Sequence, residues 1–430
     1  MRSLAKFASV GLVLTAFISM ASPAHAQDSS AASDTYIVQQ ASALGNDPNQ
    51  IFAFVRDQIH NQVYYGSVRG ARGTLWSKAG NTLDKASLLV ALLGAAGIPA
   101  QYEHTSLADP SSLILSMFPN PTQLLGCIPT TDFVDTPAFN GPVRSDAFSY
   151  YWVQYGAGIQ LDPNQPAWLP GTTPPFPPDS SSGFTTVPDN LRQKVTVKLN
   201  AELYSQSSGL FGQGPGTTTV LTQTFNASDL IGHPLSVGTL VQSTGAGALD
   251  ITATTFTYTP YILVGSGGPD VKQDHIIVGT NFQELFTNFP LGSSVLTGLF
   301  LEIDAEDITY TQHAYTRTIF DRLGPAARQG TASVQLNLPA TPKPALTSFD
   351  IATVNILTSN QLVTAFQAQQ TRLTNAYNNY LAIKPALASV PTTGPLTAAQ
   401  QSIAQQGATL AQYLLIAENE LIAMSYAGAA

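Results

Sequence analysis

The sequence predicts an α+β protein in which a buried helix packs on antiparallel strands, followed by a β-sandwich-like module and a C-terminal helical pair. Three observations lead to this fold class. Residues 80–100 form an apolar stretch with the start and stop signals of a helix. Residues 193–338 contain segments that are β-branched or alternate between apolar and polar. Residues 362–384 and 397–424 carry apolar residues at helical spacing.

Composition divides the chain into five segments. The boundaries follow shifts in polarity, a stretch dense in proline and serine, and a change to Ala, Gln, Leu and Asn near the end. The predicted segments are a signal peptide at 1–26, the domain of the buried helix at 27–168, a linker at 169–190, a β-rich domain at 191–345 and a helical region at 346–430. A length of 430 residues agrees with two or three folded domains.

The first 26 residues have the three parts of a secretory signal peptide. Arg2 and Lys6 supply a basic end, residues 7–21 are apolar, and Ala24-His25-Ala26 fits the small-x-small cleavage rule. The apolar run of about 15 residues is shorter than a bilayer span. We therefore expect export to the periplasm or the medium, with Gln27 as the mature N-terminus and no membrane span after cleavage.

Net charge and cysteine content exclude several classes of partner and site. Removal of the two signal-peptide cations leaves 16 basic against 27 acidic residues, a formal charge of −11. Such a balance argues against nucleic acid and anionic membrane surfaces as partners. The single cysteine, Cys127, rules out an internal disulfide and is interpreted as a small buried hydrophobe. No close pair of His, Cys or carboxylate residues has a recognisable ligand spacing, so no metal and no other cofactor is expected.

The apolar stretch at 80–100 is the centre of the first domain. Asn81 or Thr82 offers a side-chain oxygen to cap a helix, and Asp84 places negative charge in its first turn. The rest of the stretch carries no charge beyond the first turn, and Gly97 and Pro99 end the helix after roughly 15 residues. A helix that is apolar all round and too short to span a bilayer is expected to lie in a soluble core.

Strands and further helices follow from local patterns around this helix. Residues 51–59 have helical apolar spacing, and a strand is expected at 98–102. Residues 149–162 predict a hairpin of two strands that turns at the Gly-Ala-Gly of 156–158. Residues 385–395 separate the two C-terminal helices, which are therefore expected to form an antiparallel pair.

The buried helix and the hairpin resemble the bacterial transglutaminase-like superfamily, whose architecture is shared with papain-like cysteine proteases. The resemblance covers roughly residues 51–168. In the helix it rests on these matching residues: Gly80, Asp84, Ala86, Leu88, Leu89, Ala91, Leu92, Leu93, Ala95, Ala96, Gly97, Ile98, Pro99 and Ala100. In the hairpin it rests on Trp152, Val153 and the Asp162-Pro163 pair.

The resemblance also implies where the site lies. Thr82 stands at the position of the family's nucleophilic cysteine, Tyr150 at that of its histidine, and Asp162 matches the acid that orients the histidine. Trp76 and Trp152 are the corresponding cleft-lining residues. The family therefore implies a site at Thr82, Tyr150 and Asp162, of which only Asp162 keeps the family's residue type.

Three classes of function remain open. The first is a catalytically degenerate, exported domain, a pseudoenzyme that keeps the cleft for binding a protein or peptide or for scaffolding. The second is an acyl transferase or peptidase that uses Thr82, which would need a strong base because a hydroxyl loses its proton less readily than a thiol. Tyr150, with an ordinary pKa of about 10, is a poor base, and neither His60 nor His104 lies on the strand that normally supplies it. The third is a structural module with a filled cleft.

Overall fold

The computed structural model describes most of the chain. The described residues are 32–116, 142–205, 216–244, 253–265, 275–287, 293–306, 312–331, 342–346, 352–354, 362–391 and 395–429. The predicted signal peptide and Cys127 lie outside them. The described residues contain helices and mostly antiparallel strands, so the α+β class predicted from the sequence is confirmed.

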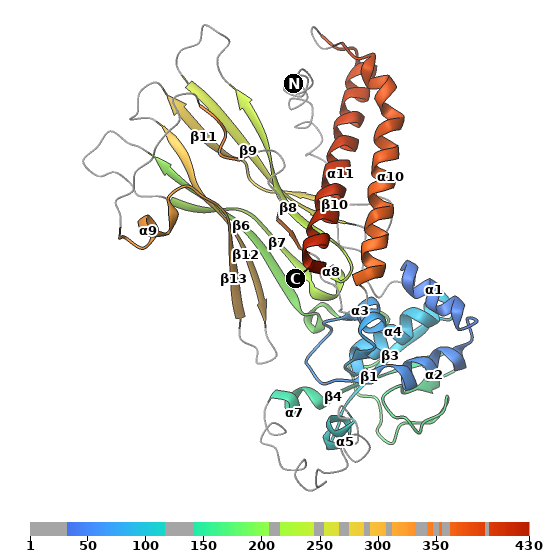
Figure 1. The fold of residues 1–430 in the computed structure, drawn as a ribbon. Helices are drawn as coiled ribbons and strands as arrows, with labels where there is room; N and C mark the ends of the chain where they lie inside the picture. The colour runs from blue at the N-terminus through green and yellow to red at the C-terminus, as the bar shows by residue number, and fades with distance from the viewer. Residues whose placement is uncertain are drawn as a thin grey trace.

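The N-terminal domain combines short helices with a three-stranded antiparallel sheet in the order β3-β4-β5 (Figure 1). Its helices are α1 (Thr35–Ala43), α2 (Pro48–Gln58), α3 (Gly70–Ser77), α4 (Thr82–Ala95), α5 (Ser111–Leu115) and α7 (Pro142–Ala147). Its strands are β1 (His60–Asn61), β2 (Ala79–Gly80), β3 (Ala100–Ser106), β4 (Ser149–Tyr155) and β5 (Ile159–Leu161). The short strands β1 and β2 pair in parallel and bring the start of α4 beside the end of α2.

Helix α4 is the core of this domain, as its composition predicts. Leu83, Leu88 and Leu92 are fully buried, and α4 packs against α1, α2 and α3 on one side and against β3 and β4 on the other. The helix ends before Gly97, whose φ of 77° lies in the left-handed region that glycine adopts without strain. The apolar circumference of α4 is therefore covered as far as Leu93, apart from the half-buried Val90.

The segment at 169–190, which the sequence suggests is a linker, packs against the N-terminal domain. Phe184 stacks on Tyr102 with ring centroids 4.7 Å apart, and its carbonyl accepts a hydrogen bond from the Tyr102 N–H. Phe176 lies against the rings of Tyr150 and Trp152 on the other face of the sheet. Aromatic residues thus hold both faces of β3 and β4 from this one segment.

The β-rich part is one antiparallel sheet that curls, with the main strand order β14-β8-β9-β11-β12-β6-β7. Its strands are β6 (Lys194–Ser205), β7 (Gly216–Asn226), β8 (Leu235–Thr244), β9 (Ala253–Val264), β10 (His275–Val278), β11 (Phe282–Thr287), β12 (Ser294–Glu306), β13 (Gln312–Asp321) and β14 (Ala352–Val354). Short helices α8 (Ala227–Leu230) and α9 (Gly324–Arg328) follow β7 and β13, and a 3₁₀ turn (Asp189–Leu191) precedes β6.

Helices α10 (Leu362–Ala388) and α11 (Ala398–Ala429) form the predicted antiparallel pair beside the sheet (Figure 1). Tyr413 of α11 packs near Tyr261 and Leu263 of β9. Helix α10 is one turn longer than predicted, because it continues through Pro385. Among the described residues, no helix combines the length and the apolarity needed to cross a membrane.

Candidate functional site

The hydroxyl of Thr82 joins the start of α4 to β4. It donates to the carbonyl of Ser149 over 3.3 Å and accepts from the N–H of Tyr151 over 3.2 Å. Thr82 does not cap the helix: Asn81 is the N-cap, and its side chain accepts from the Asp84 N–H over 2.8 Å. The capping role considered for Thr82 is therefore wrong, and its hydroxyl instead serves a helix-to-strand contact.

Tyr150 and Asp162 form a buried hydrogen-bonded pair. The Tyr150 hydroxyl donates to Asp162 Oδ2 over 2.6 Å, and the Asn164 N–H donates to Oδ1 over 2.8 Å. Since Thr82 is bonded to both backbone neighbours of Tyr150, the structure brings Thr82, Tyr150 and Asp162 together. The three residues that the sequence analysis singled out thus lie in one hydrogen-bonded group at the start of α4 and on β4.

Burial sets the protonation of this pair. It raises the pKa of Asp162 to about 6, against the opposing effects of hydrogen bonds from Tyr150 and Asn164 and of the charge on Lys85. Burial and the neighbouring Asp162 charge raise the pKa of the Tyr150 phenol well above its ordinary value. Tyr150 therefore stays a hydrogen-bond donor at neutral pH and offers no base to Thr82.

Lys85, one turn after Thr82, is a buried cation that the sequence analysis missed. Its side chain is 1% exposed, and Nζ donates to the Ile59 carbonyl over 2.9 Å and to Asn61 Oδ1 over 2.7 Å. Burial lowers the pKa of Lys85 to about 7, and the charge of Asp162 opposes that shift. The signal that could have revealed it is a lysine in the first turn of a helix that is otherwise apolar.

Asp84 fixes the loop that faces Thr82. Its buried carboxylate accepts bonds from the hydroxyls of Tyr64 and Ser67 and from three consecutive backbone N–H groups at 68–70. These N–H groups stand at the start of α3, where helices leave donors without internal partners. One carboxylate therefore ties the beginning of α3 to the beginning of α4.

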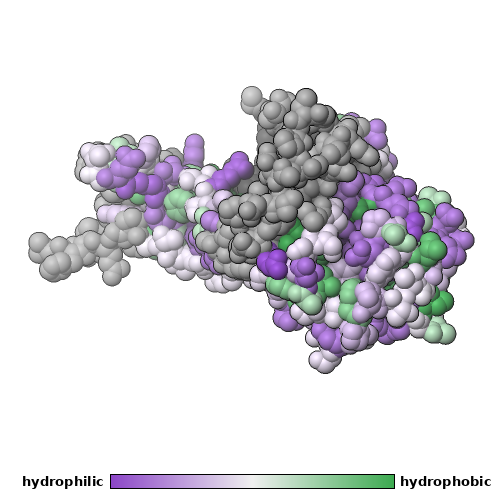
Figure 2. Space-filling model, turned by 90° about the horizontal axis from the view of Figure 1, so that it is seen from below, coloured by the Kyte–Doolittle hydropathy of each residue, from purple (hydrophilic) through white to green (hydrophobic). Residues whose placement is uncertain are grey.

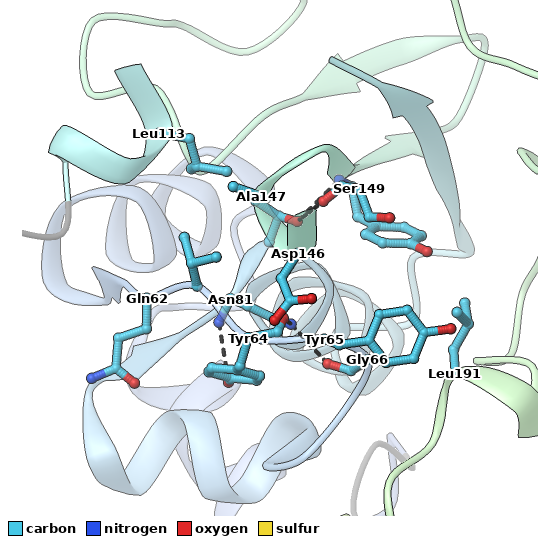
Figure 3. A pocket seen from close by; sticks show the side chains of 13 residues that line it. Gln62, Tyr64, Tyr65, Gly66, Asn81, Leu113, Asp146, Ala147, Ser149 and Leu191 are labelled. Carbon is cyan, nitrogen blue, oxygen red and sulfur yellow. Dashed lines mark hydrogen bonds between the residues drawn. The ribbon is translucent and has the colours of Figure 1, made fainter. Parts of the chain in front are cut away.

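A small pocket lies at the start of α4 (Figure 3). Aromatic and polar side chains dominate its lining, which consists of Gln62, Val63, Tyr64, Tyr65, Gly66, Asn81, Thr82, Leu113, Asp146, Ala147, Ser149, Tyr151 and Leu191. Asp146 projects from α7 toward the loop that carries Tyr64 and Tyr65. The cavity volume is about 10 Å³, which is room for one water molecule. The surroundings of Thr82 are nearly filled.

The two tryptophans expected to line the cleft lie elsewhere. Trp76 is 6% exposed and packs edge-on against Tyr36, with its ring close to Gly232 of the sheet part. Trp152 is 1% exposed, packs on Phe176 and donates its indole N–H to Gln160 over 2.6 Å. Neither is among the residues that line the pocket. Both are packing residues in this fold.

His104, on strand β3, is paired with the carboxylate of Asp179. Its Nδ1 lies 2.8 Å from Asp179 Oδ2, and its ring is 4.5 Å from that of Tyr151. The hydrogen bonds of the Thr82 hydroxyl go to backbone groups of 149 and 151 and not to this ring. In the described part of the chain, no group of three His, Cys, Asp or Glu side chains is placed to hold a metal ion.

Comparison with known proteins identifies the N-terminal domain. Residues 32–155 match the transglutaminase-like superfamily, a range that includes α1 to β4 and both Thr82 and Tyr150. Asp162 lies just beyond the matched range. No curated protein and no solved structure matches the chain. The family resemblance seen in the sequence is confirmed for this domain.

Proposed function

We propose that the transglutaminase-like superfamily domain at residues 32–155 is catalytically degenerate and acts as a scaffold for the sheet and the helical pair that follow it. One observation carries the proposal: the Thr82 hydroxyl, at the nucleophile position, is bonded to the backbone on both sides of Tyr150. At the base position, the Tyr150 hydroxyl is itself a donor, to Asp162. Both positions support structural hydrogen bonds.

The chemistry of these groups argues against acyl transfer. A threonine hydroxyl becomes a nucleophile only when a base removes its proton. Thr82 donates that proton to the carbonyl oxygen of Ser149, which cannot accept it as a base. Tyr150 has a raised pKa and remains protonated. A hydroxyl held in this way is expected to lack the reactivity of the family's thiolate.

The pocket favours scaffolding over ligand binding. A cavity of about 10 Å³ has room for one water molecule, so a peptide side chain would enter only after lining residues moved. On the described part of the face seen in Figure 2, hydrophobic residues lie in small patches among hydrophilic ones. The domain instead makes a close contact with the rest of the chain, through α3 and the segment 231–234.

The test combines activity with stability. We expect the purified protein to show no transamidation, glutamine deamidation or peptide hydrolysis. Thr82→Val keeps the shape but leaves the Ser149 carbonyl and the Tyr151 N–H unbonded, which should lower the free energy of unfolding by about 1–3 kcal/mol. Thr82→Ser keeps the hydroxyl and serves as the matched control. Turnover by the natural protein that Thr82→Val abolishes at unchanged stability would overturn the proposal in favour of a threonine-dependent enzyme.

We also propose that the chain is exported. The support is the sequence of residues 1–26, with its basic end, apolar run and Ala24-His25-Ala26 site. Protein recovered from the periplasm or medium should begin at or near Gln27 when its N-terminus is sequenced. Recovery of the intact form alone, in the cytosol, would contradict export.

A further inference from the structure

The N-terminal domain meets the sheet at a contact without spare room. Residues 231–234, between α8 and β8, lie against α3. A Cβ on Gly73 would lie 2.6 Å from the Ile231 side chain, and one on Gly232 would lie 2.5 Å from the Trp76 ring. At Gly73 the Ile231 side chain could shift, but at Gly232, where φ is 73°, the rigid Trp76 ring leaves no room for a side chain. A contact this close is sensitive to a charge placed inside it.

His233 stands at the centre of this contact. His233 is only 4% exposed. Its Nδ1 lies 2.8 Å from the Gly265 carbonyl oxygen, and its Nε2 lies 3.0 Å from Nη1 of Arg72. A carbonyl only accepts and a guanidinium only donates. Nδ1 therefore carries the proton and Nε2 accepts, which assigns His233 as a neutral imidazole from its hydrogen-bond partners.

The charged groups around His233 come from four elements. Arg72 of α3 is paired with Asp34, the N-cap of α1, through Nε at 2.7 Å and Nη2 at 2.5 Å. Arg372 of α10 lies near Gly265, because its Nη2 would be 3.2 Å from a Cβ added to that glycine. A charge on His275 of β10 also lowers the pKa of His233. Asp34 is already engaged by Arg72, so a proton on Nε2 of His233 would face a guanidinium.

We propose that His233 is a pH-sensitive latch, whose protonation loosens the contact between α3 and the 231–234 segment. A proton on Nε2 removes the acceptor of the Arg72 bond and sets two cations about 3 Å apart. The same loosening reaches the pocket, because Leu191 lines it and its carbonyl accepts from the Ser67 N–H over 2.6 Å. Gln193, at the start of the sheet, donates its own N–H to the Ser67 carbonyl. Separation would draw Leu191 away and widen the pocket.

The sign and the size of the effect follow from linkage. Burial and the nearby Arg72 charge lower the pKa of His233 to about 4 in the closed contact, against an ordinary value of about 6.5 once it is open. The stabilising contribution is therefore complete above pH 6.5 and is lost as the pH falls toward 4. At pH 5 the ratio of open to closed forms should be about 30-fold higher than at pH 7.5.

Amide hydrogen exchange measures this ratio directly. Protection factors, corrected for the intrinsic exchange rate at each pH, are compared at pH 7.5 and pH 5 for peptides spanning 70–77 and 227–234. We expect a fall of about 30-fold in the natural protein and none in His233→Gln, whose side-chain amide has a donor and an acceptor but does not titrate. His275→Gln should respond like the natural protein. A peptide within α4 reports global unfolding and should keep its protection.

Two outcomes would overturn the latch. One is equal protection of both peptides at the two pH values in the natural protein, a result that needs no variant to fold. The other is an equal fall in His233→Gln, which would place the titrating group elsewhere.

Discussion

Asp84→Asn is the substitution for which the structure predicts the largest effect near the site. The carboxylate is fully buried and accepts five hydrogen bonds, two at Oδ1 and three at Oδ2. The amide that replaces it has the same shape but one acceptor atom fewer. With its nitrogen in place of Oδ1, the hydroxyl of Ser67 turns to accept, and the N–H of Gly70 is left without a partner.

The magnitude follows from these bonds. An unpartnered buried N–H costs about 1–3 kcal/mol, and each remaining bond weakens by about 1 kcal/mol when its acceptor loses its charge. Relief of a buried charge opposes this loss, because burial already raises the pKa of Asp84 and so disfavours its ionised form. We expect a net loss of about 3 kcal/mol in the free energy of unfolding.

Guanidinium denaturation followed by tryptophan fluorescence measures this loss in the N-terminal domain. All three tryptophans of the chain lie between Trp76 and Trp168, so the signal reports this domain and, through Trp76, its contact with Gly232. The matched control is Asp109→Asn, whose side chain is 70% exposed and should change stability by less than about 0.5 kcal/mol. A loss at Asp84 below about 1 kcal/mol, or one equal to that at Asp109, would refute the reasoning.

Two further substitutions test the site and the domain contact. Thr82→Cys with Tyr150→His places a thiol at the start of α4 and a histidine on β4. The new thiol should react with an alkylating agent faster than Cys127 near pH 7, because a helix start beside a histidine lowers a thiol's pKa. Mass spectrometry of labelled peptides measures both rates, and equal rates would contradict the expectation. Gly232→Ala combines a φ of 73° with a Cβ 2.5 Å from a ring and should cost about 2–4 kcal/mol. Gly97→Ala, with a φ of 77° and open space, should cost only about 1 kcal/mol in the same denaturation assay.

The sequence predicts best those features that local patterns determine. The extent of α4 follows from Asn81 at its start and Gly97 after its end, and both signals act within a few residues. The turn between β4 and β5 follows in the same way from Gly156 and Gly158, which both have positive φ. The position of Thr82 beside Tyr150 could be predicted because the start of the helix and the hairpin both resemble the transglutaminase-like superfamily.

Features that depend on distant contacts could not be predicted. The role of Trp76 is fixed by Gly232, which lies more than 150 positions further along the chain, and no pattern around the tryptophan points there. Thr82 and Asn81 were interchangeable as caps on residue type alone, since both have a side-chain oxygen. Only the approach of β4, which supplies a donor and an acceptor to Thr82, decides between them.

The buried Lys85, one turn after Thr82, acts on the same carboxylate as Tyr150. Asp162 is 2% exposed, so its ionised form is costly unless a neighbouring group stabilises the charge. Here it faces the phenol of Tyr150, which bears no positive charge, and burial raises the pKa of Asp162 to about 6. Lys85 lowers that pKa through its charge, and Asp162 in turn raises the pKa of Lys85. Each of the two buried groups therefore favours the charged form of the other, and Lys85→Met should raise the pKa of Asp162 further.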